Sequence, residues 1–323
     1  MRCKVICNPN SGRHASPQKL EQILGKLVMG HDVSLVDVYR TKGDGDAWKT
    51  AAALSMADYD LVIGAGGDGT LNEIVNGLME GGSGLPLAML PGGTVNDFAY
   101  YMGLPTDAEE FCLMLRRGSV RAVDLGWANG RYFINVAAFG MFAEVAYKTS
   151  NRDKSILGKL AYYMQGMRDV PEQLFSTMQL QAICGEESLE AEALVCIIAN
   201  SSSVAGVRRF MNKAQVDDGL LDLFLVTKPA WQTLSETFQG LFKGEGLRMG
   251  IIWQKQISEA SFFIRDAKNV NVDLDGEKCG ALPLTIKVAP KALKLFVPEE
   301  SRLRLNLGYR EQKPLTNGLI IEE

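Results

Sequence analysis

The sequence predicts an α/β domain built on a parallel sheet, followed by a β-rich domain. Up to about residue 120, short apolar runs typical of buried strands alternate with segments of helical apolar spacing, as in a parallel sheet covered by helices on both faces. Beyond that point, apolar and polar residues alternate along several stretches, which indicates half-buried antiparallel strands. We therefore expect residues 1–124 to form the first domain and residues 125–297 the second, with a tail at 298–323 that is either loose or packed back on the first domain.

The first domain is expected to repeat the order strand, loop, helix. Ser16 is a suitable helix cap and Pro17 a favoured first-turn residue, so a helix should begin at residue 17. The predicted strands are Cys3–Cys7, Val33–Tyr39, Asp60–Gly64 and Pro86–Leu90, and the predicted helices are Pro17–Met29, Asp46–Ala57 and Thr70–Glu80.

The second domain is predicted from a hairpin signal and from alternating patterns. Asn129-Gly130 is a preferred two-residue turn, and it lies between the stretches Val120–Trp127 and Arg131–Ala137. Apolar residues alternate again within residues 270–274, 282–288 and 293–297. These stretches are expected to be antiparallel strands.

Composition narrows the class of protein. Of the 323 residues, 46% are apolar and 22% are charged, as in folded globular proteins. The formal net charge of −4 argues against a broad nucleic-acid surface. No apolar run approaches the roughly 18 residues that cross a bilayer, and the start lacks the apolar region of a signal peptide. The 6 cysteines include no Cys-x-x-Cys pair, so we expect reduced thiols, no zinc site and a cytoplasmic protein.

A glycine-rich loop follows the third predicted strand. Residues 66–70 read Gly-Gly-Asp-Gly-Thr and open a helix. Glycines let the backbone approach an anion closely, and N–H groups at a helix N-terminus point towards it. Asp68 would repel phosphate on its own, and its presence makes sense if it holds magnesium, directly or through water. We interpret this loop as a phosphate site rather than an ordinary capped turn.

Two further loops end other strands of the same sheet. Residues 8–13 offer small polar donors and the charge of Arg13, and residues 91–97 offer Thr94 and Asn96, with Asp97 as a cap or as their partner. Ligands of parallel sheets bind beyond the carboxyl ends of the strands, where these loops converge. Each loop alone could be a simple turn, so the hypothesis depends on their convergence. The sequence contains neither the P-loop motif nor the His-Arg-Asp loop of protein kinases.

Acidic residues gather in two places late in the sequence. The apolar residues 270, 272 and 274 place Asn271, Asp273 and Asp275 on the other face of a strand, and Glu277 follows the turn at 276. Carboxylates at a strand end suit a general base for a hydroxyl group, although solvated turn residues have the same pattern. Residues 217–222 read Asp-Asp-Gly-Leu-Leu-Asp, which fits hard oxygen ligands of magnesium or calcium, or an ordinary acidic turn.

Together these motifs resemble the diacylglycerol kinase catalytic-domain family, which comprises soluble bacterial lipid kinases related to sphingosine kinases and more distantly to NAD kinases. The resemblance covers nearly the whole chain, and the matching pieces, in the family's order, are Asn8–Gly12, Gly66–Glu73, Pro91–Ala99, Asp217–Asp222 and Asp275–Glu277. Glycine–aspartate signatures also occur in NAD kinases and phosphofructokinases. The resemblance to lipid kinases therefore depends on Asn96-Asp97 in the Pro91–Ala99 motif and on the later motif Asp217–Asp222.

The resemblance implies a nucleotide-binding first domain of the NAD kinase and phosphofructokinase type, a β-sandwich second domain, a cleft between them, and a tail that adds to the first domain. It implies ATP and Mg²⁺ as cofactors. With the loop residues above, the expected ATP contacts are Asn8, Asn10, Ser11, Gly12, Arg13, His14, Thr41, Gly66, Gly67, Asp68, Gly69, Thr70, Leu71, Asn72, Thr94 and Asn96.

The resemblance also implies roles for acidic residues. Glu277 is the expected proton acceptor, with Asp275 beside it as a second candidate, and Asp68 and Asp124 complete the candidate catalytic set. A structural magnesium ion is expected at Asp218, with the carbonyl groups of Gln215 and Leu220, and Asp124 is expected to assist that site.

The sequence departs from the family's pattern at three places, which bear on the substrate more than on the nucleotide. Tyr100 and Tyr101 follow where Arg is common, the Gly-x-Asp-Ala piece reads Met141-Phe142-Ala143-Glu144 and lacks the usual Asp, and Asn212 stands where Pro is common.

Helical spacing predicts two further helices, at 153–169 and 230–242. The first overlaps Asn151–Arg168, where an apolar stripe is combined with an excess of basic residues. Such a helix either rests on an anionic membrane surface or packs in the core with a solvated basic face. We expect a cytoplasmic protein that meets its lipid at the membrane surface, and a homodimer is left open.

The sequence therefore predicts an ATP-dependent lipid kinase that phosphorylates diacylglycerol to phosphatidic acid. The alternatives are a kinase of another lipid alcohol such as sphingosine, an NAD kinase-like enzyme, a nucleotide-binding regulator without catalysis, and a membrane-surface module. Intact Asp68, Asp275 and Glu277 speak against the regulator.

Overall fold

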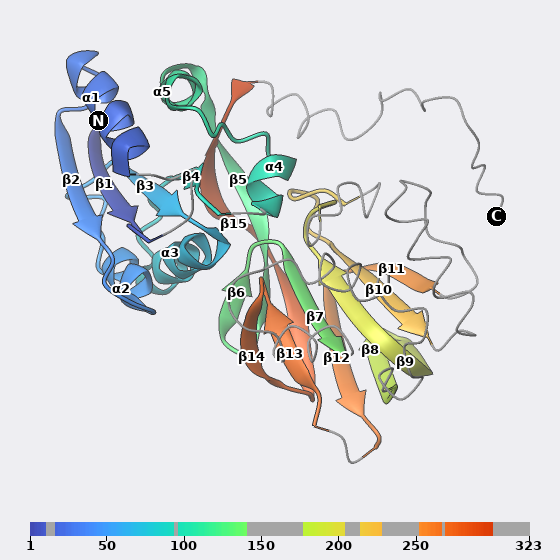
Figure 1. The fold of residues 1–323 in the computed structure, drawn as a ribbon. Helices are drawn as coiled ribbons and strands as arrows, with labels where there is room; N and C mark the ends of the chain where they lie inside the picture. Colours follow the sequence, from blue (N-terminus) through green and yellow to red (C-terminus); the bar gives the residue numbers. More distant parts are fainter. Residues whose placement is uncertain are drawn as a thin grey trace, which may run out of the picture.

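The computed structural model describes residues 1–10, 17–93, 96–140, 177–203, 214–227, 252–266 and 269–299. These residues form an α/β domain and a β-rich domain, as predicted, and long strands pass from one to the other (Figure 1). The elements in chain order are β1 (Arg2–Cys7), α1 (Pro17–Met29), β2 (Leu35–Arg40), α2 (Asp46–Ala52), β3 (Leu61–Gly66), α3 (Asp68–Gly81), β4 (Leu87–Pro91), α4 (Asp97–Tyr101), α5 (Ala108–Arg117), β5 (Ser119–Ala128), β6 (Arg131–Phe133), β7 (Val136–Gly140), β8 (Met178–Cys184), β9 (Glu187–Ala199), β10 (Leu221–Thr227), β11 (Ile252–Ile257), β12 (Glu259–Ile264), β13 (Asn271–Leu274), β14 (Glu277–Ala281) and β15 (Leu284–Val297).

The α/β domain is organised on a parallel sheet with the strand order β4-β3-β1-β2. Figure 1 shows α1 and α5 together on one side of this sheet and α2 and α3 together on the other. Strands β1, β3 and β4 are buried over nearly their whole lengths, because helices cover both faces. The loops that follow these three strands therefore meet at one edge of the sheet.

The helices agree with the sequence prediction except at some of their ends. Helix α1 has the predicted bounds, and α3 begins at Asp68 rather than at Thr70. The predicted helix Asp46–Ala57 is wrong in its last part, since α2 ends at Ala52. The Ser55 hydroxyl there accepts the Ala57 N–H at 3.1 Å, and this local turn competes with the helical hydrogen bonds.

The hairpin predicted at Asn129-Gly130 joins β5 to β6, and both turn residues have the positive φ angles, 49° and 79°, that such a turn requires. The predicted second arm, Arg131–Ala137, is wrong as a single strand. It divides into β6 and β7 because the N–H groups of residues 134–136 turn towards the carboxylate of Asp275 instead of a neighbouring strand. This break places β7 between β13 and β9 in the second domain.

The β-rich domain is antiparallel within the described residues, with β14, β13, β7, β9, β8, β12 and β15 in spatial order and β10 and β11 beside β9. Its strands show the predicted alternation. In β8, for example, every second residue from Met178 to Cys184 is buried. Phe139 and Phe262 from two of these strands make an edge-to-face contact with ring centroids 5.1 Å apart in the core.

Strand β15 connects the two domains. The sequence suggested separate strands at 282–288 and 293–297, whereas the structure forms one strand with an irregularity between Ala289 and Leu293. Its first part packs in the core of the β-rich domain, and its last part, from Leu293, packs in the core of the α/β domain. Strand β5 lies antiparallel to it along most of its length. The division of the chain near residues 124 and 297 stays a prediction.

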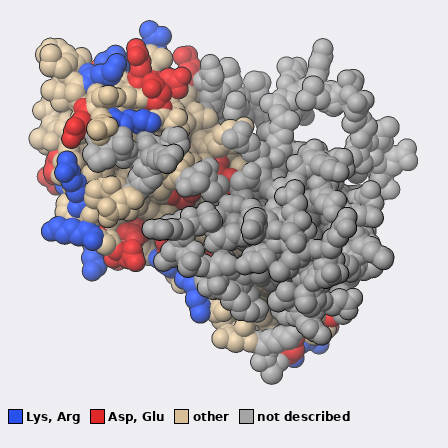
Figure 2. Space-filling model, viewed as in Figure 1, with Lys and Arg blue, Asp and Glu red and all other residues tan. Residues whose placement is uncertain are grey.

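Several predictions fall outside the described residues, namely the helices at 151–168 and 230–242, residues 141–144 and the tail after residue 299. Within the described part, no helix has the length and apolar character needed to cross a membrane. The face of the α/β domain seen in Figure 2 carries acidic and basic side chains intermixed. All six cysteines are free and buried.

Candidate active site

The turns that follow β3 and β4 touch each other. Gly92 N–H donates to the Gly66 carbonyl group at 2.7 Å, and a Cβ atom added to Gly93 would lie 3.2 Å from the Gly67 Cα. A Cβ atom on Gly66 would lie 2.7 Å from the Thr70 Cβ. A side chain at Gly93 would therefore crowd the turn after β3, and one at Gly66 would displace Thr70. The approach leaves the first N–H groups of α3 at the edge of the sheet, where they suit an anion.

The loop after β1 reaches the same place. The Asn8 amide donates to the Thr70 hydroxyl at 3.1 Å and accepts from Asn10 N–H at 3.0 Å. Thr41, which follows β2, is buried and donates its N–H to the Cys7 carbonyl group at 2.9 Å. The structure thus brings together the described residues of the predicted phosphate loops. The expected contacts Ser11, Gly12, Arg13, His14 and Thr94 lie outside the described residues.

Asp68 occupies the first turn of α3, beside the loop after β4. Asn96 has a left-handed backbone with φ 51° and donates its N–H to the Asp68 carboxylate at 3.3 Å. The Asn96 side chain also makes two hydrogen bonds to Gly93, of 2.8 and 2.7 Å, which hold the loop in shape. Burial raises the pKa of Asp68 to about 6, and the nearby Asp97 and Asp275 also raise it, against the lowering effect of Asn96 N–H. The Leu71 side chain, another of the expected ATP contacts, is buried in the core of the α/β domain.

We expect Asp68→Asn to stabilise the protein at neutral pH in the absence of ligands. With a pKa raised from 3.8 to about 6, the folded state binds the proton more tightly than the unfolded state, so the stabilising contribution of Asp68 falls as the pH rises through this window. At neutral pH the ionised side chain costs roughly 1–3 kcal/mol, which the amide avoids. Denaturant unfolding at neutral and acid pH measures the difference.

Asp60→Asn is the control for this prediction. Hydrogen bonds from Arg2 hold the pKa of Asp60 below its usual value, so its replacement should destabilise the fold at neutral pH. A loss of stability in Asp68→Asn as well would contradict the burial argument.

Asp275 is held by hydrogen bonds from two domains. Its left-handed backbone, with φ 52°, directs the side chain towards β7. One carboxylate oxygen accepts from Asn135 N–H and Val136 N–H, both at 2.9 Å, and the other accepts from Ile134 N–H at 2.6 Å and from the Asn72 amide at 2.8 Å. Burial raises the pKa of Asp275, and these four donors oppose the rise. Because both oxygens are engaged, this carboxylate fits a positioning role better than a proton-accepting one.

Helix α3 extends this connection through Asn76, one turn after Asn72. The Asn76 side chain exchanges two hydrogen bonds with the backbone of Tyr132 in β6, donating at 2.9 Å and accepting at 2.8 Å. Its amide also donates to the Asn72 side chain at 3.0 Å. The same helix that begins at the glycine turn of residues 66–70 is therefore tied to the hairpin of the second domain.

Glu277 begins β14 and faces the glycine turn of residues 66–70. A Cβ atom on Gly69 would lie 3.2 Å from its Oε1, and Arg131 Nη2 lies 3.6 Å from its Oε2. Burial raises the pKa of Glu277, as do Glu73, Asp275 and Asp44, while Arg131 lowers it. A half-buried carboxylate with a raised pKa at this position is a suitable general base.

Asp124 and the acidic turn at 217–219 form a separate group. Asp124 is fully buried, and its carboxylate accepts from Gly219 N–H at 2.7 Å and from Lys291 N–H at 2.6 Å. Asp218 accepts from Leu220 N–H at 3.0 Å. Burial raises the pKa of both Asp217 and Asp218, and Asp124 raises both further. Asp217 also raises the pKa of Asp218, whereas Lys291 and Arg121 lower that of Asp217.

This group of carboxylates fits a divalent cation, since its described members offer oxygen ligands. Among the described residues, no three Asp, Glu, His or Cys side chains are placed to bind a metal ion by themselves. An ion at Asp218 would therefore need the backbone carbonyl groups of Gln215 and Leu220 and water, a ligand set that Mg²⁺ accepts.

The sequence interpretation missed four residues of this region: Trp48, Asn76, Arg131 and Ser203. Asn76 had a signal, because it lies four residues after Asn72 on the apolar face of a helix, where a polar side chain needs a partner. The Ser203 hydroxyl donates to the Asp97 carboxylate at 2.8 Å and joins α4 to the end of β9. No local pattern distinguishes Ser203, Arg131 or Trp48.

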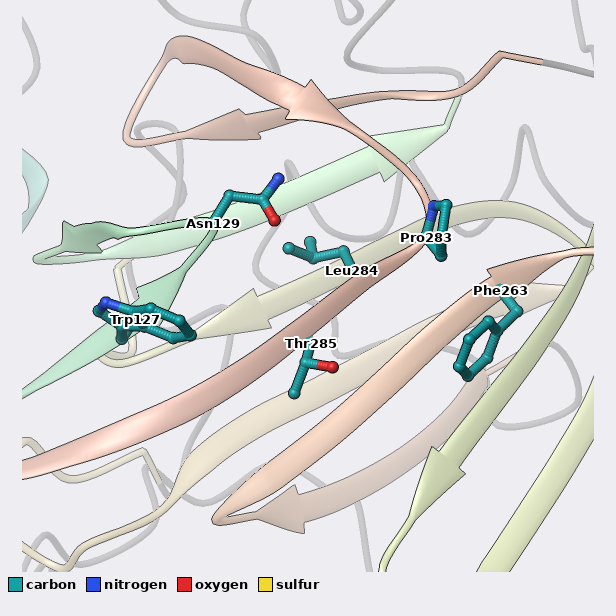
Figure 3. A pocket seen from close by; sticks show the side chains of 6 residues that line it. All are labelled: Trp127, Asn129, Phe263, Pro283, Leu284 and Thr285. Carbon is teal, nitrogen blue, oxygen red and sulfur yellow. The ribbon is translucent and has the colours of Figure 1, made fainter.

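A shallow surface groove of about 390 Å³ lies elsewhere on the β-rich domain (Figure 3). It is lined by side chains of β5, β12 and β15 and of the residues that adjoin β5 and β15. The described lining residues are Trp127, Asn129, Phe263, Pro283, Leu284 and Thr285. None of these belongs to the predicted site.

Known families match both parts of the chain. Residues 2–128 match the model described as diacylglycerol kinase catalytic domain, and residues 135–297 match the YegS C-terminal NAD kinase beta sandwich-like domain. The second match agrees with the β-sandwich that the resemblance implied. The order of the two matches is the order expected from the motifs.

Curated relatives and solved structures agree with these matches. A diacylglycerol kinase of Staphylococcus saprophyticus is 33% identical over 300 residues, which cover 93% of this chain and 96% of that protein. The diacylglycerol kinase of Staphylococcus haemolyticus is 32% identical and covers 99% of this chain and 94% of its own length. A Bacillus anthracis diacylglycerol kinase structure shares the fold, with a TM-score of 0.73 at 24% identity over 93% of this chain and 98% of that chain.

A second Bacillus anthracis structure has a TM-score of 0.78 at 27% identity and covers 93% of this chain and 97% of that chain. Membership of a kinase family implies ATP as the phosphoryl donor. With relatives at this identity along nearly its whole length, the chain belongs to the diacylglycerol kinase family.

Proposed function

We propose that this protein transfers the γ-phosphoryl group of ATP to the hydroxyl group of diacylglycerol and forms phosphatidic acid. The family and the names of its relatives support a lipid kinase. The observation that carries the mechanism is the approach of Glu277, from the β-rich domain, to Gly69 in the phosphate turn of the α/β domain. A proton acceptor and a phosphate site thus face each other across the two domains.

The α/β domain supplies the phosphate site. The turns at 66–70 and 91–93 pack against each other and direct N–H groups at the start of α3 outwards, and Asn8 joins the first loop to Thr70. We assign the ATP phosphates to this place, with the adjoining residues 11–14 and Thr94 as further predicted contacts. Most of the catalytic effect then comes from positioning the phosphoryl group towards the acceptor.

Magnesium fits two places in this arrangement. Asp68 lies at the phosphate turn, and the acidic turn with Asp218 and the carbonyl groups of Gln215 and Leu220 offers hard oxygen donors. When bound with ATP, the ion would offset the negative charge of the phosphates. Asp124 holds the acidic turn against Lys291 in β15 through its two hydrogen bonds.

The proton transfer is assigned to Glu277. As the lipid oxygen forms its bond to the γ-phosphorus atom, the bond from that atom to the β–γ bridging oxygen breaks and ADP leaves, while Glu277 accepts the hydroxyl proton. Burial raises the pKa of this carboxyl group and makes its ionised form a stronger base. Asp275, with both oxygens engaged, orients β7 and α3 around it.

The test is a transfer assay on the full chain with ATP labelled in the γ-phosphate, Mg²⁺ and separate acceptors. Diacylglycerol and sphingosine in mixed micelles and NAD in solution distinguish the candidate substrates. We expect labelled phosphatidic acid, and omission of Mg²⁺ should abolish it. Label found only in sphingosine phosphate or in NADP would contradict the assignment, and nucleotide binding without any transfer would indicate a regulator.

The encounter with the lipid is proposed to take place at the membrane surface. Sedimentation with vesicles that contain anionic lipid should recover the protein, and binding without any kinase activity would favour a membrane-surface module instead. Oligomeric state is a separate question, which analytical ultracentrifugation of the full chain answers.

A further inference from the structure

Arg131 lies between the two elements that form the proposed site. It is the first residue of β6, directly after the Asn129-Gly130 turn. The Asn129 amide donates to the Cys279 carbonyl group of β14 at 3.2 Å, and the next residue, Tyr132, is held by Asn76 of α3 through two hydrogen bonds. The backbone of Arg131 is therefore tied to the strand that carries Glu277 and to the helix that begins at the phosphate turn.

Its side chain is held on both sides. The guanidinium carbon lies 5.2 Å from the centre of the Trp48 ring, and Nη2 lies 3.6 Å from Glu277 Oε2. The Trp48 indole N–H in turn donates to Glu80 of α3. A planar guanidinium that lies over an aromatic ring and beside a carboxylate has a preferred orientation, which a lysine side chain could not reproduce.

The two oxygens of Glu277 have different surroundings as a result. Oε2 faces Arg131, whereas Oε1 faces the phosphate turn, 3.2 Å from the position of a Cβ atom on Gly69. Of the two oxygens, Oε1 is therefore the one nearer to Gly69, where the proposed function places the ATP phosphates.

Negative charges surround Glu277, and the ion pair with Arg131 opposes them. Glu73 of α3, Asp275 in the turn before β14 and Asp44 before α2 all act on it with the same sign. Glu73 is fixed by hydrogen bonds from Gly45 N–H and Ala47 N–H, of 2.8 and 3.1 Å. In the described part of the chain, Arg131 is the cation within ion-pair distance of Glu277. Without it, repulsion would favour a Glu277 rotamer that points away from the turn.

On the basis of the proposed function, we propose that Arg131 is a positioning residue that holds Glu277 Oε2 and presents Oε1 to the acceptor hydroxyl group. Arg131 itself does not transfer a proton. Its role is to set the geometry and the charge of the general base, and Trp48 supports it in that role.

The test compares Arg131→Met and Arg131→Lys in the full chain. The Met variant should lower kcat by roughly 100-fold, because a misplaced base loses its alignment, while the KM for ATP stays within about twofold. The Lys variant keeps the charge and should recover part of kcat. Since Arg131 lowers the pKa of Glu277, the acid limb of the kcat profile should move to higher pH in the Met variant.

Arg116→Met is the matched control, because Arg116 pairs with Asp32 at 2.8 Å on the surface of the α/β domain and should leave kcat unchanged. An unchanged kcat and pH profile in Arg131→Met would overturn the proposal. A rise in the KM for ATP at constant kcat would overturn it too, since Arg131 would then bind nucleotide. So would equal losses in the Met and Lys variants with an unmoved acid limb, which indicate a structural role only.

A measurement without substrate separates this proposal from the proposed function. Carboxyl-carbon NMR of glutamate-labelled protein follows the titration of Glu277, and Glu277→Gln identifies its signal. A higher pKa of Glu277 in Arg131→Met supports the restraint even if the wild type phosphorylates none of the acceptors. An unchanged pKa overturns the proposal, whatever the wild-type activity.

Discussion

Glu277→Gln is expected to lower kcat by roughly 10²–10⁴-fold, the usual contribution of a general base. The amide has the same shape but cannot accept the hydroxyl proton. Its neutral side chain also removes the repulsion from Glu73, Asp275 and Asp44, so the fold should be retained. Because the phosphate loops are unchanged, the KM for ATP should move little. Steady-state kinetics with diacylglycerol micelles and a nucleotide-binding titration measure both quantities.

Glu259→Gln is the control, since Glu259 is an exposed residue of β12 that pairs with Lys287 at 3.2 Å and should leave kcat unchanged. In the wild type, kcat should fall as the pH drops through the raised pKa of Glu277, because protonation removes the base. A Gln variant with near wild-type kcat would exclude Glu277 as the proton acceptor.

Asp275→Ala is expected to produce the largest loss of stability, roughly 3–5 kcal/mol of unfolding free energy. The substitution leaves three backbone N–H groups, of residues 134–136, and the Asn72 amide without their shared acceptor. Unsatisfied buried donors are costly because they have already lost their water. Denaturant unfolding followed by circular dichroism measures the loss.

Asp107→Ala provides the comparison for this effect. Asp107 accepts hydrogen bonds from Glu109 N–H and Glu110 N–H at the exposed start of α5, and loss of such a cap costs about 1 kcal/mol. Asp275→Asn keeps one carbonyl oxygen and should fall between the two. If Asp275→Ala costs no more than Asp107→Ala, Asp275 does not hold the domains together.

Much of the fold could be predicted because the relevant information is local. Pro17 and the apolar spacing after it define α1, and Asn129-Gly130 has the backbone preferences of the turn that joins β5 to β6. The predictions failed where a distant residue intervenes. The strand predicted over Arg131–Ala137 breaks because Asp275, far along the chain, takes three of its N–H groups.

In the candidate site, too, the local features could be predicted and the long-range contacts could not. The glycine turn at 66–70 and the loops after β1 and β4 could be found because glycines and small polar residues follow strands. The pairing of Arg131 with Glu277 could not, because nothing in the residues near Arg131 shows which carboxylate its side chain meets. Nor could the sequence show which of Asp275 and Glu277 has a free carboxylate oxygen, since two acidic residues two positions apart look alike in a sequence.

What the sequence determined by itself is the kind of element at most places, the location of the glycine-rich turns, and the family, because periodicity, turn propensity and motif order are properties of neighbouring residues. What only the tertiary structure decided is the division of labour between carboxylates. Asp275 accepts four hydrogen bonds and is engaged, whereas Glu277 directs Oε1 towards Gly69. That difference arises from hydrogen-bond donors and charges that folding brings from α3, β6 and β7, and the free energy of a carboxylate depends on those neighbours rather than on its own position in the chain.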